Sequence, residues 1–138
     1  MNSKIILIVA IVVIGVGAAL FFVLGGEDVE PAPVRFEYAP GDFFTTNVSG
    51  GKDGSGSSRI LKAAVVLVVN RDDMEEMLKL NNASIRDTII FILRDLDEEY
   101  IRAQGNKDEL RQRIITALNE RLGIDNFIDV LFNDFVMA

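Results

Sequence analysis

The stretch 63-AAVVLVV-69 decides the fold of the main part of this chain. It is the most apolar run after residue 24, and no polar residue interrupts it. A short, continuous run of this kind predicts a strand that is buried on both faces, at the centre of a sheet. The rest of the fold follows from what can pack against this strand.

Two short segments before this run are predicted to be strands. Residues 34–38 alternate apolar and charged side chains, which is the period of a half-buried strand. Phe43–Val48 is rich in aromatic and β-branched residues, which favour extended structure. The glycine-serine stretch Ser49–Ser58 would let Phe43–Val48 pair with the central run as a long-looped hairpin.

A fourth strand is predicted at the C-terminal end, over Phe127–Val136. The alternation there suggests two faces. One face would hold Ile128, Val130, Phe132 and Val136, and the other Asp129, Asn133 and Phe135.

Three helices are predicted between the central run and the last strand. The first begins near Asn70 and is interrupted at residues 81–82. The second begins at Ser84, with Asp87 in the capping-box position, and continues to Tyr100. The third opens at Asn106 and ends before residue 123, a glycine placed for a left-handed C-cap. The order of elements predicts an α+β domain, one small sheet with about three helices on one face.

A different structure is predicted for Ile5–Leu24, IILIVAIVVIGVGAALFFVL. This segment contains no charged, polar or proline residue, and as a helix it would reach about 30 Å, the thickness of the hydrocarbon layer. Phe21–Leu24 fill the place where a signal peptide would carry small residues for cleavage. We therefore expect a permanent, single transmembrane helix.

The charges that flank this segment predict its orientation. Lys4 precedes it, and three acidic residues follow it in the linker 25–33. The positive-inside rule then places residues 1–4 in the cytoplasm as a short stub. It places residues 34–138 outside, as an extracytoplasmic domain anchored in the cytoplasmic (inner) membrane.

Gly15 and Ala19 lie four residues apart within the predicted membrane helix. Small residues at this spacing let helices approach closely in lipid, which makes the pair a candidate for helix packing. The alternative is that glycine and alanine are simply common in membrane helices.

Composition narrows the class of function. The formal net charge is −7, so binding to nucleic acid through phosphate neutralisation is not expected. There is no cysteine and no histidine, which removes the usual zinc ligands and thiol nucleophiles. The acidic residues among 95–99 are predicted to form a solvated helix face. We expect no catalytic residues, no cofactor and no metal.

Phe91 does not fit the amphipathic pattern of the second helix. On a helical wheel it lies roughly 150° from the centre of the apolar stripe, and Ile90 lies about 110° from it. Asp87 and Arg94 are beside them. An aromatic residue on a charged face is either covered by another part of the chain or available to a partner. These four residues are the candidate self-association or partner contact.

The ordered set of motifs resembles the flagellar basal body-associated FliL family over nearly the full length. The resemblance is carried by the N-terminal anchor and by Tyr38, Phe44–Val48, Arg59–Asn70, Ile85–Asp87, Ile89, Ile90, Gly105–Arg111, Asn119, Leu122 and Val130–Val136. The chain departs from the family pattern in its short stub, in Asn133 where threonine is common, and in its ending Met137-Ala138.

This resemblance implies a non-enzymatic accessory protein of the flagellar motor. It implies a domain similar to the stomatin-type (SPFH) fold, located at the flagellar basal body. It also implies association with the MotA/MotB stator, self-assembly into a homo-oligomeric ring, and possible contacts with other basal body components.

Two other functions stay open on the residues alone. A membrane-anchored extracytoplasmic sensor would need a concave pocket with converging polar groups. An acid hydrolase would need two carboxylates held roughly 5 to 9.5 Å apart in a cleft.

Overall fold

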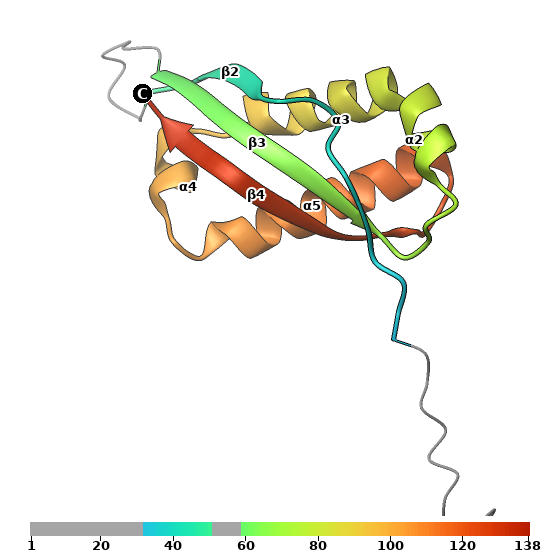
Figure 1. The fold of residues 1–138 in the computed structure, drawn as a ribbon. Coiled ribbons are helices and arrows are strands. Elements are labelled where there is room, and N and C mark those ends of the chain that lie inside the picture. The colour runs from blue at the N-terminus through green and yellow to red at the C-terminus, as the bar shows by residue number, and fades with distance from the viewer. Residues whose placement is uncertain (1–31, 51–58) are drawn as a thin grey trace, which may run out of the picture. The chain divides into compact units, whose positions relative to one another are not determined.

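The computed structural model describes residues 32–50 and 59–138 (Figure 1). The chain divides into two units, Met1–Ala32 and Pro33–Ala138. The predicted membrane helix, with Gly15 and Ala19, lies outside the described residues, as do the stub and most of the linker. No helix among the described residues is long and apolar enough to cross a membrane.

The second unit is an α+β domain, as predicted, with a four-stranded sheet. Its described residues form four helices, one more than expected. The elements are β1 (Phe36–Tyr38), β2 (Phe44–Val48), β3 (Arg59–Val69), α2 (Glu75–Leu80), α3 (Asn82–Arg94), α4 (Glu98–Arg102), α5 (Asn106–Leu122) and β4 (Phe127–Met137).

The central position of the stretch 63–69 is confirmed, because β3 pairs antiparallel with all three other strands. β1 pairs with Leu67–Val69 and β2 pairs with Arg59–Ala63. β4 pairs along the opposite edge of β3, from residue 61 to residue 69. The sheet is therefore three strands wide, with β1 and β2 in line on one edge.

The two faces of this sheet differ. One face is covered by α3 and α5, which lie on the same side of β3 and β4 in Figure 1. The β3 side chains on that face are all buried: Leu61, Ala63, Val65, Leu67 and Val69. On the other face, Ile60 and Lys62 are exposed, whereas Ala64 and Val66 are half-buried. Within the predicted stretch 63–69 this second face is covered only in part at Ala64 and Val66, and the exposed positions of β3 lie before that stretch.

Val68 is the exception on this open face, because it is completely buried. Its partners across the sheet are Glu37 on β1 and Asp129 on β4. Arg35 forms an ion pair with Asp129, 3.5 Å from Nη2 to Oδ2. Side chains directly across the sheet can cover an apolar neighbour with their aliphatic parts, and Glu37 and Asp129 have that position on either side of Val68.

β4 differs from the expected alternation. The register with β3 shifts twice, once opposite Val68 and Val69 and once opposite Ala64 and Val65. Ile128 and Asn133 are the extra residues at these two bulges, and each bulge reverses the face on which later side chains lie. Phe135 therefore packs against the core, while Ile128 is 39% exposed and Val136 is 52% exposed.

The second helix was predicted to be continuous as far as Tyr100, but the structure divides it into two helices, α3 and α4. α3 begins at Asn82 rather than Ser84, and no side chain caps its start, so the predicted capping box is absent. The helix ends at Arg94 because Asp97 is extended and forms a bridge with Ser49, at the end of β2. The third predicted helix is confirmed as α5, and Gly123 has the left-handed conformation expected of its C-cap, with φ 65°.

Candidate functional site

The outer face of α3 carries the residues singled out from the sequence. Phe91 is 63% exposed, and Asp87 and Arg94 are exposed as well. These three residues are spaced by four and by three positions, so they lie in one row along the helix. We call them the α3 ridge.

The core side of α3 explains why Phe91 faces outward. The helix buries Ile85, Ile89, Ile92 and Leu93. This apolar stripe faces the sheet and α5, which leaves Phe91 on the opposite side. Ile90 is half-buried and packs against the edge of the core, so the structure does not place it on the α3 ridge.

Arg86 fixes the start of α3 to the loop before β2. Its Nη1 donates to the carbonyl of Pro40 at 3.0 Å, and its guanidinium carbon lies 4.6 Å from the centre of the Phe44 ring. Gly41 leaves room for this arrangement, because a Cβ there would lie 2.0 Å from Nη1. The helix that carries the α3 ridge is therefore fixed to the loop before β2 and to Phe44 by packing, a hydrogen bond and a cation–π contact.

α5 fixes α3 from the other side. Arg113 forms an ion pair with Asp95, just after the end of α3. Arg121 donates from Nε to the hydroxyl oxygen of Ser84 at 3.2 Å. Both ends of α3 are therefore tied to the same neighbouring helix.

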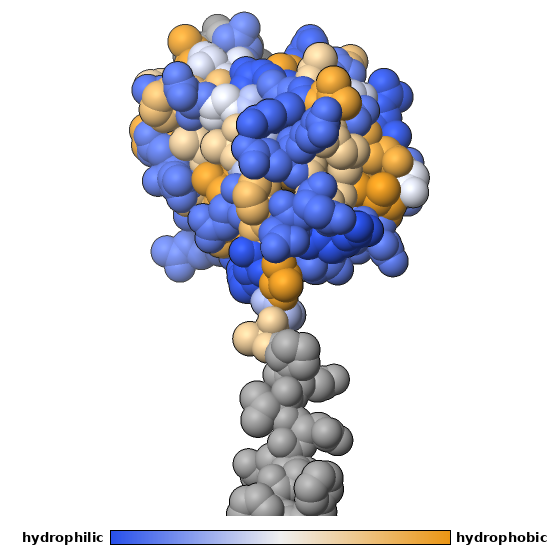
Figure 2. Space-filling view, turned by 45° about the vertical axis from the view of Figure 1, so that its right-hand side comes forward, coloured by the Kyte–Doolittle hydropathy of each residue, from blue (hydrophilic) through white to orange (hydrophobic). Residues whose placement is uncertain are grey.

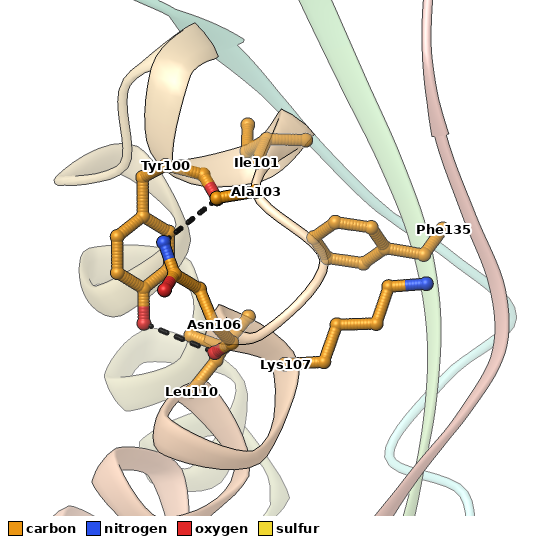
Figure 3. Close-up of a pocket in the computed structure, with 7 residues that line it drawn as sticks. All are labelled: Tyr100, Ile101, Ala103, Asn106, Lys107, Leu110 and Phe135. Carbon is orange, nitrogen blue, oxygen red and sulfur yellow. Dashed lines mark hydrogen bonds between the residues drawn. The ribbon is translucent and has the colours of Figure 1, made fainter.

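A small hollow lies where α4, α5 and β4 meet (Figure 3). Tyr100 and Asn106 close one side of it. The Tyr100 hydroxyl donates to the Asn106 carbonyl at 3.2 Å, and Asn106 Nδ2 donates to the Tyr100 carbonyl at 3.1 Å. Burial, and next the Glu109 charge, raise the pKa of Tyr100, so its hydroxyl keeps the proton that it donates.

This hollow has a volume of about 10 Å³, which is room for a single water. The larger hollows found in the described residues, of about 490, 320 and 290 Å³, are open dips along the surfaces of helices. Small-molecule sites usually enclose most of their ligand. None of these four hollows of the described residues is an enclosed cavity large enough for a ligand.

The carboxylates of residues 95–98 have structural partners. Asp97 accepts a hydrogen bond from the backbone N–H of Tyr100 at 2.7 Å, as the N-cap of α4. Glu98 pairs with both Arg59 and Arg102. No group of three or more potential metal ligands occurs within residues 32–50 and 59–138.

Asn119 was part of the sequence resemblance, but its role becomes clear only in the fold. Its side-chain amide both accepts from the Phe127 N–H and donates to the Phe127 carbonyl, each at 3.1 Å. It thus imitates a neighbouring strand at the outer edge of β4. The sequence gives no signal for this contact, because it depends on where α5 places one amide.

The fold and the surface define a two-layer α+β domain that has one open sheet face and an exposed aromatic residue on its helical layer. Residues 38–137 match the family described as flagellar basal body-associated protein FliL. The chain belongs to this family, whose members are accessory proteins of the flagellar motor. No curated protein matches the chain.

Proposed function

We propose that this protein is a non-enzymatic, membrane-anchored accessory of the flagellar motor that self-associates into a ring and supports the MotA/MotB stator. In this proposal Ile5–Leu24 spans the cytoplasmic membrane, and the domain 34–138 lies outside the cytoplasm at the basal body. Family membership supports the motor role. The ring and the stator contact are inferred from the sequence resemblance and from the α3 ridge.

The single observation that carries the self-association is the exposure of Phe91. Aromatic residues are enriched at the centres of protein interfaces, and charged residues such as Asp87 and Arg94 suit the polar rim. Phe91 is 63% exposed in the single chain, so its ring is accessible to a second copy. The α3 ridge therefore has the composition of a small contact surface.

Tethering to a membrane makes a small contact sufficient. Copies held in one membrane meet at a much higher effective concentration than copies free in solution. Gly15 and Ala19 would add close packing between the membrane helices.

The test compares two substitutions of exposed apolar residues in the full-length chain. Phe91→Glu places a charge at the centre of the α3 ridge. Leu80→Glu makes the same kind of change on α2, where the side chain is 80% exposed, and serves as the matched control. Tagged protein is purified from membranes of flagellated cells, MotA and MotB in the eluate are quantified, and swimming is measured.

We expect wild-type protein and Leu80→Glu to carry MotA and MotB and to support swimming equally. Phe91→Glu should reduce the recovery of MotA and MotB by about tenfold or more, and it should also reduce swimming. The amount of the variant in the membrane should equal that of the wild-type protein. Absence of the stator from the wild-type eluate would contradict the stator association. Equal behaviour of the two variants would contradict a role for Phe91.

A further inference from the structure

The open face of the sheet carries a cluster of exposed apolar side chains. We call Phe43, Ile60, Lys62, Asp134 and Val136 the open-face patch. The register places Lys62 directly opposite Val136, and Asp134 opposite Ala64, the next residue of β3 on this face. Phe43 contacts this cluster through Lys62, because the Lys62 ammonium lies 3.8 Å from the centre of the Phe43 ring.

The clustering is unusual for this domain. Seven large apolar side chains are exposed among the described residues, and three of them belong to the open-face patch. Phe43 is 43% exposed, Ile60 is 47% exposed and Val136 is 52% exposed. The face of the domain seen in Figure 2 is mostly hydrophilic, with hydrophobic side chains in small groups. Grouped exposed apolar residues indicate an interaction site.

The open-face patch and the α3 ridge lie on opposite sides of the domain. α3 covers one face of the sheet (Figure 1) and buries its stripe on that side, which leaves Phe91 on its outer side, whereas the register and exposure place Ile60 and Val136 on the other face of the sheet. One molecule cannot bring these two surfaces together. Two molecules can, and each copy then keeps one free surface for the next copy, which is the requirement for a head-to-tail array.

We infer that the open-face patch is the acceptor for the α3 ridge of a second copy of this chain, an inference that rests on the proposed self-association. Phe91 would lie against Val136. A helix would then cover the uncovered face of the sheet, the same kind of packing that α3 and α5 make on the other face.

The charges of the two surfaces are complementary. The α3 ridge has a carboxylate and a guanidinium on either side of Phe91, about 10 Å apart along the helix. The open-face patch has an ammonium on Lys62 and a carboxylate on Asp134, which are diagonal neighbours about 7 to 8 Å apart. Asp87 can face Lys62 while Arg94 faces Asp134, which fixes the direction in which the helix lies on the sheet.

The absence of natural cysteine makes a crosslinking test clean. The full-length chain with Phe91→Cys and Val136→Cys together is oxidised in membranes and separated without reductant. A head-to-tail contact joins each copy to two others, so we expect a ladder of dimers, trimers and larger species. Each single variant should give no ladder.

Ile128→Cys replaces Val136→Cys in the matched control. Ile128 is also an exposed residue of β4, at 39%, but it is eight residues away, roughly 26 Å along a strand. This pair should give no ladder. A ladder of equal strength from it would overturn the inference, because it would report collisions rather than a defined contact.

Charge reversal tests the direction of docking. Lys62→Glu should shorten the ladder of the Phe91→Cys, Val136→Cys chain, and adding Asp87→Lys should restore it. Failure of this rescue would overturn the charge pairing.

The outcomes separate this inference from the proposed function. Strong dimers from Phe91→Cys alone would show that two α3 ridges meet each other, which overturns the acceptor but keeps self-association through α3. No crosslink from any pair, with a monomeric wild-type chain, would overturn both.

Discussion

At the scale of single residues, the side-chain amide of Asn119 makes the two hydrogen bonds to Phe127 that a neighbouring strand would otherwise make. Replacing Asn119 with alanine removes both hydrogen bonds to Phe127 and leaves the N–H and carbonyl of that residue without these partners at the outer edge of β4. At about 1 kcal/mol for each hydrogen bond, Asn119→Ala should lower the free energy of unfolding by roughly 2 kcal/mol. Urea denaturation followed by circular dichroism measures this loss.

Asn47→Ala is the control for that substitution, because Asn47 is an exposed asparagine on β2. It should change the free energy of unfolding by less than about 0.5 kcal/mol. Equal losses from both variants would mean that the Asn119 amide contributes nothing specific to the edge of β4.

Val68 and Val66 test the two kinds of environment on the open face. Both belong to the apolar run of β3, but Val68 is completely buried and Val66 is half-buried. Val68→Asp should cost about 3 kcal/mol or more, because its carboxylate would be buried directly between Glu37 and Asp129, two like charges. Val66→Asp should cost clearly less. Thermal melts compare them, and the reverse order would show that the face near Val66 is covered.

At the scale of elements, α4 depends on its N-cap. Asp97→Ala removes the acceptor for the Tyr100 N–H, which should cost about 1 kcal/mol. Asp97→Asn should retain most of the stabilisation that the cap provides, because asparagine is as good an N-cap as aspartate. Hydrogen exchange of the α4 amides should therefore accelerate in the alanine variant alone. Faster exchange in both variants would mean that the charge, and not the cap, holds α4.

The elements also show how far the sequence predicts this fold. Local sequence patterns identified every strand of the described residues, α5 and its Gly123 cap: alternation for β1 and β4, residue type for β2, a continuous apolar run for β3, and helical periodicity with a glycine for α5. They missed the break between α3 and α4, because Asp97 is extended by its bridge to Ser49, 48 positions earlier in the chain. Periodicity also failed in β4, where two bulges change the faces without any sequence signal.

The α3 ridge was predicted in part. The wheel placed Phe91 opposite the apolar stripe, and its exposure agrees with that placement. The wheel could not show that Ile90 packs against the core, because that depends on the position of the neighbouring elements. The open-face patch was not predicted, since a continuous apolar run does not reveal which face of a strand stays open.

At the scale of the whole molecule, the orientation in the membrane decides where the domain works. An alkaline phosphatase reporter fused after Ala138 folds only outside the cytoplasm. We expect an active fusion, because Lys4 precedes the membrane segment and acidic residues follow it. A reporter that is active only in the cytoplasm, such as β-galactosidase, is the control. Activity of that control fusion would contradict both the orientation and the stator contact.

The central claim is that copies of this chain meet through the α3 ridge, and the mass of the detergent-extracted full-length protein tests it most directly. Light scattering on the purified protein should give a mass many times that of one chain, which is 15.3 kDa. Phe91→Glu should reduce this mass severalfold while leaving the thermal melt unchanged, because the core side of α3 is untouched. An unchanged mass would contradict the claim, and a lost melting transition would show that Phe91 belongs to the core.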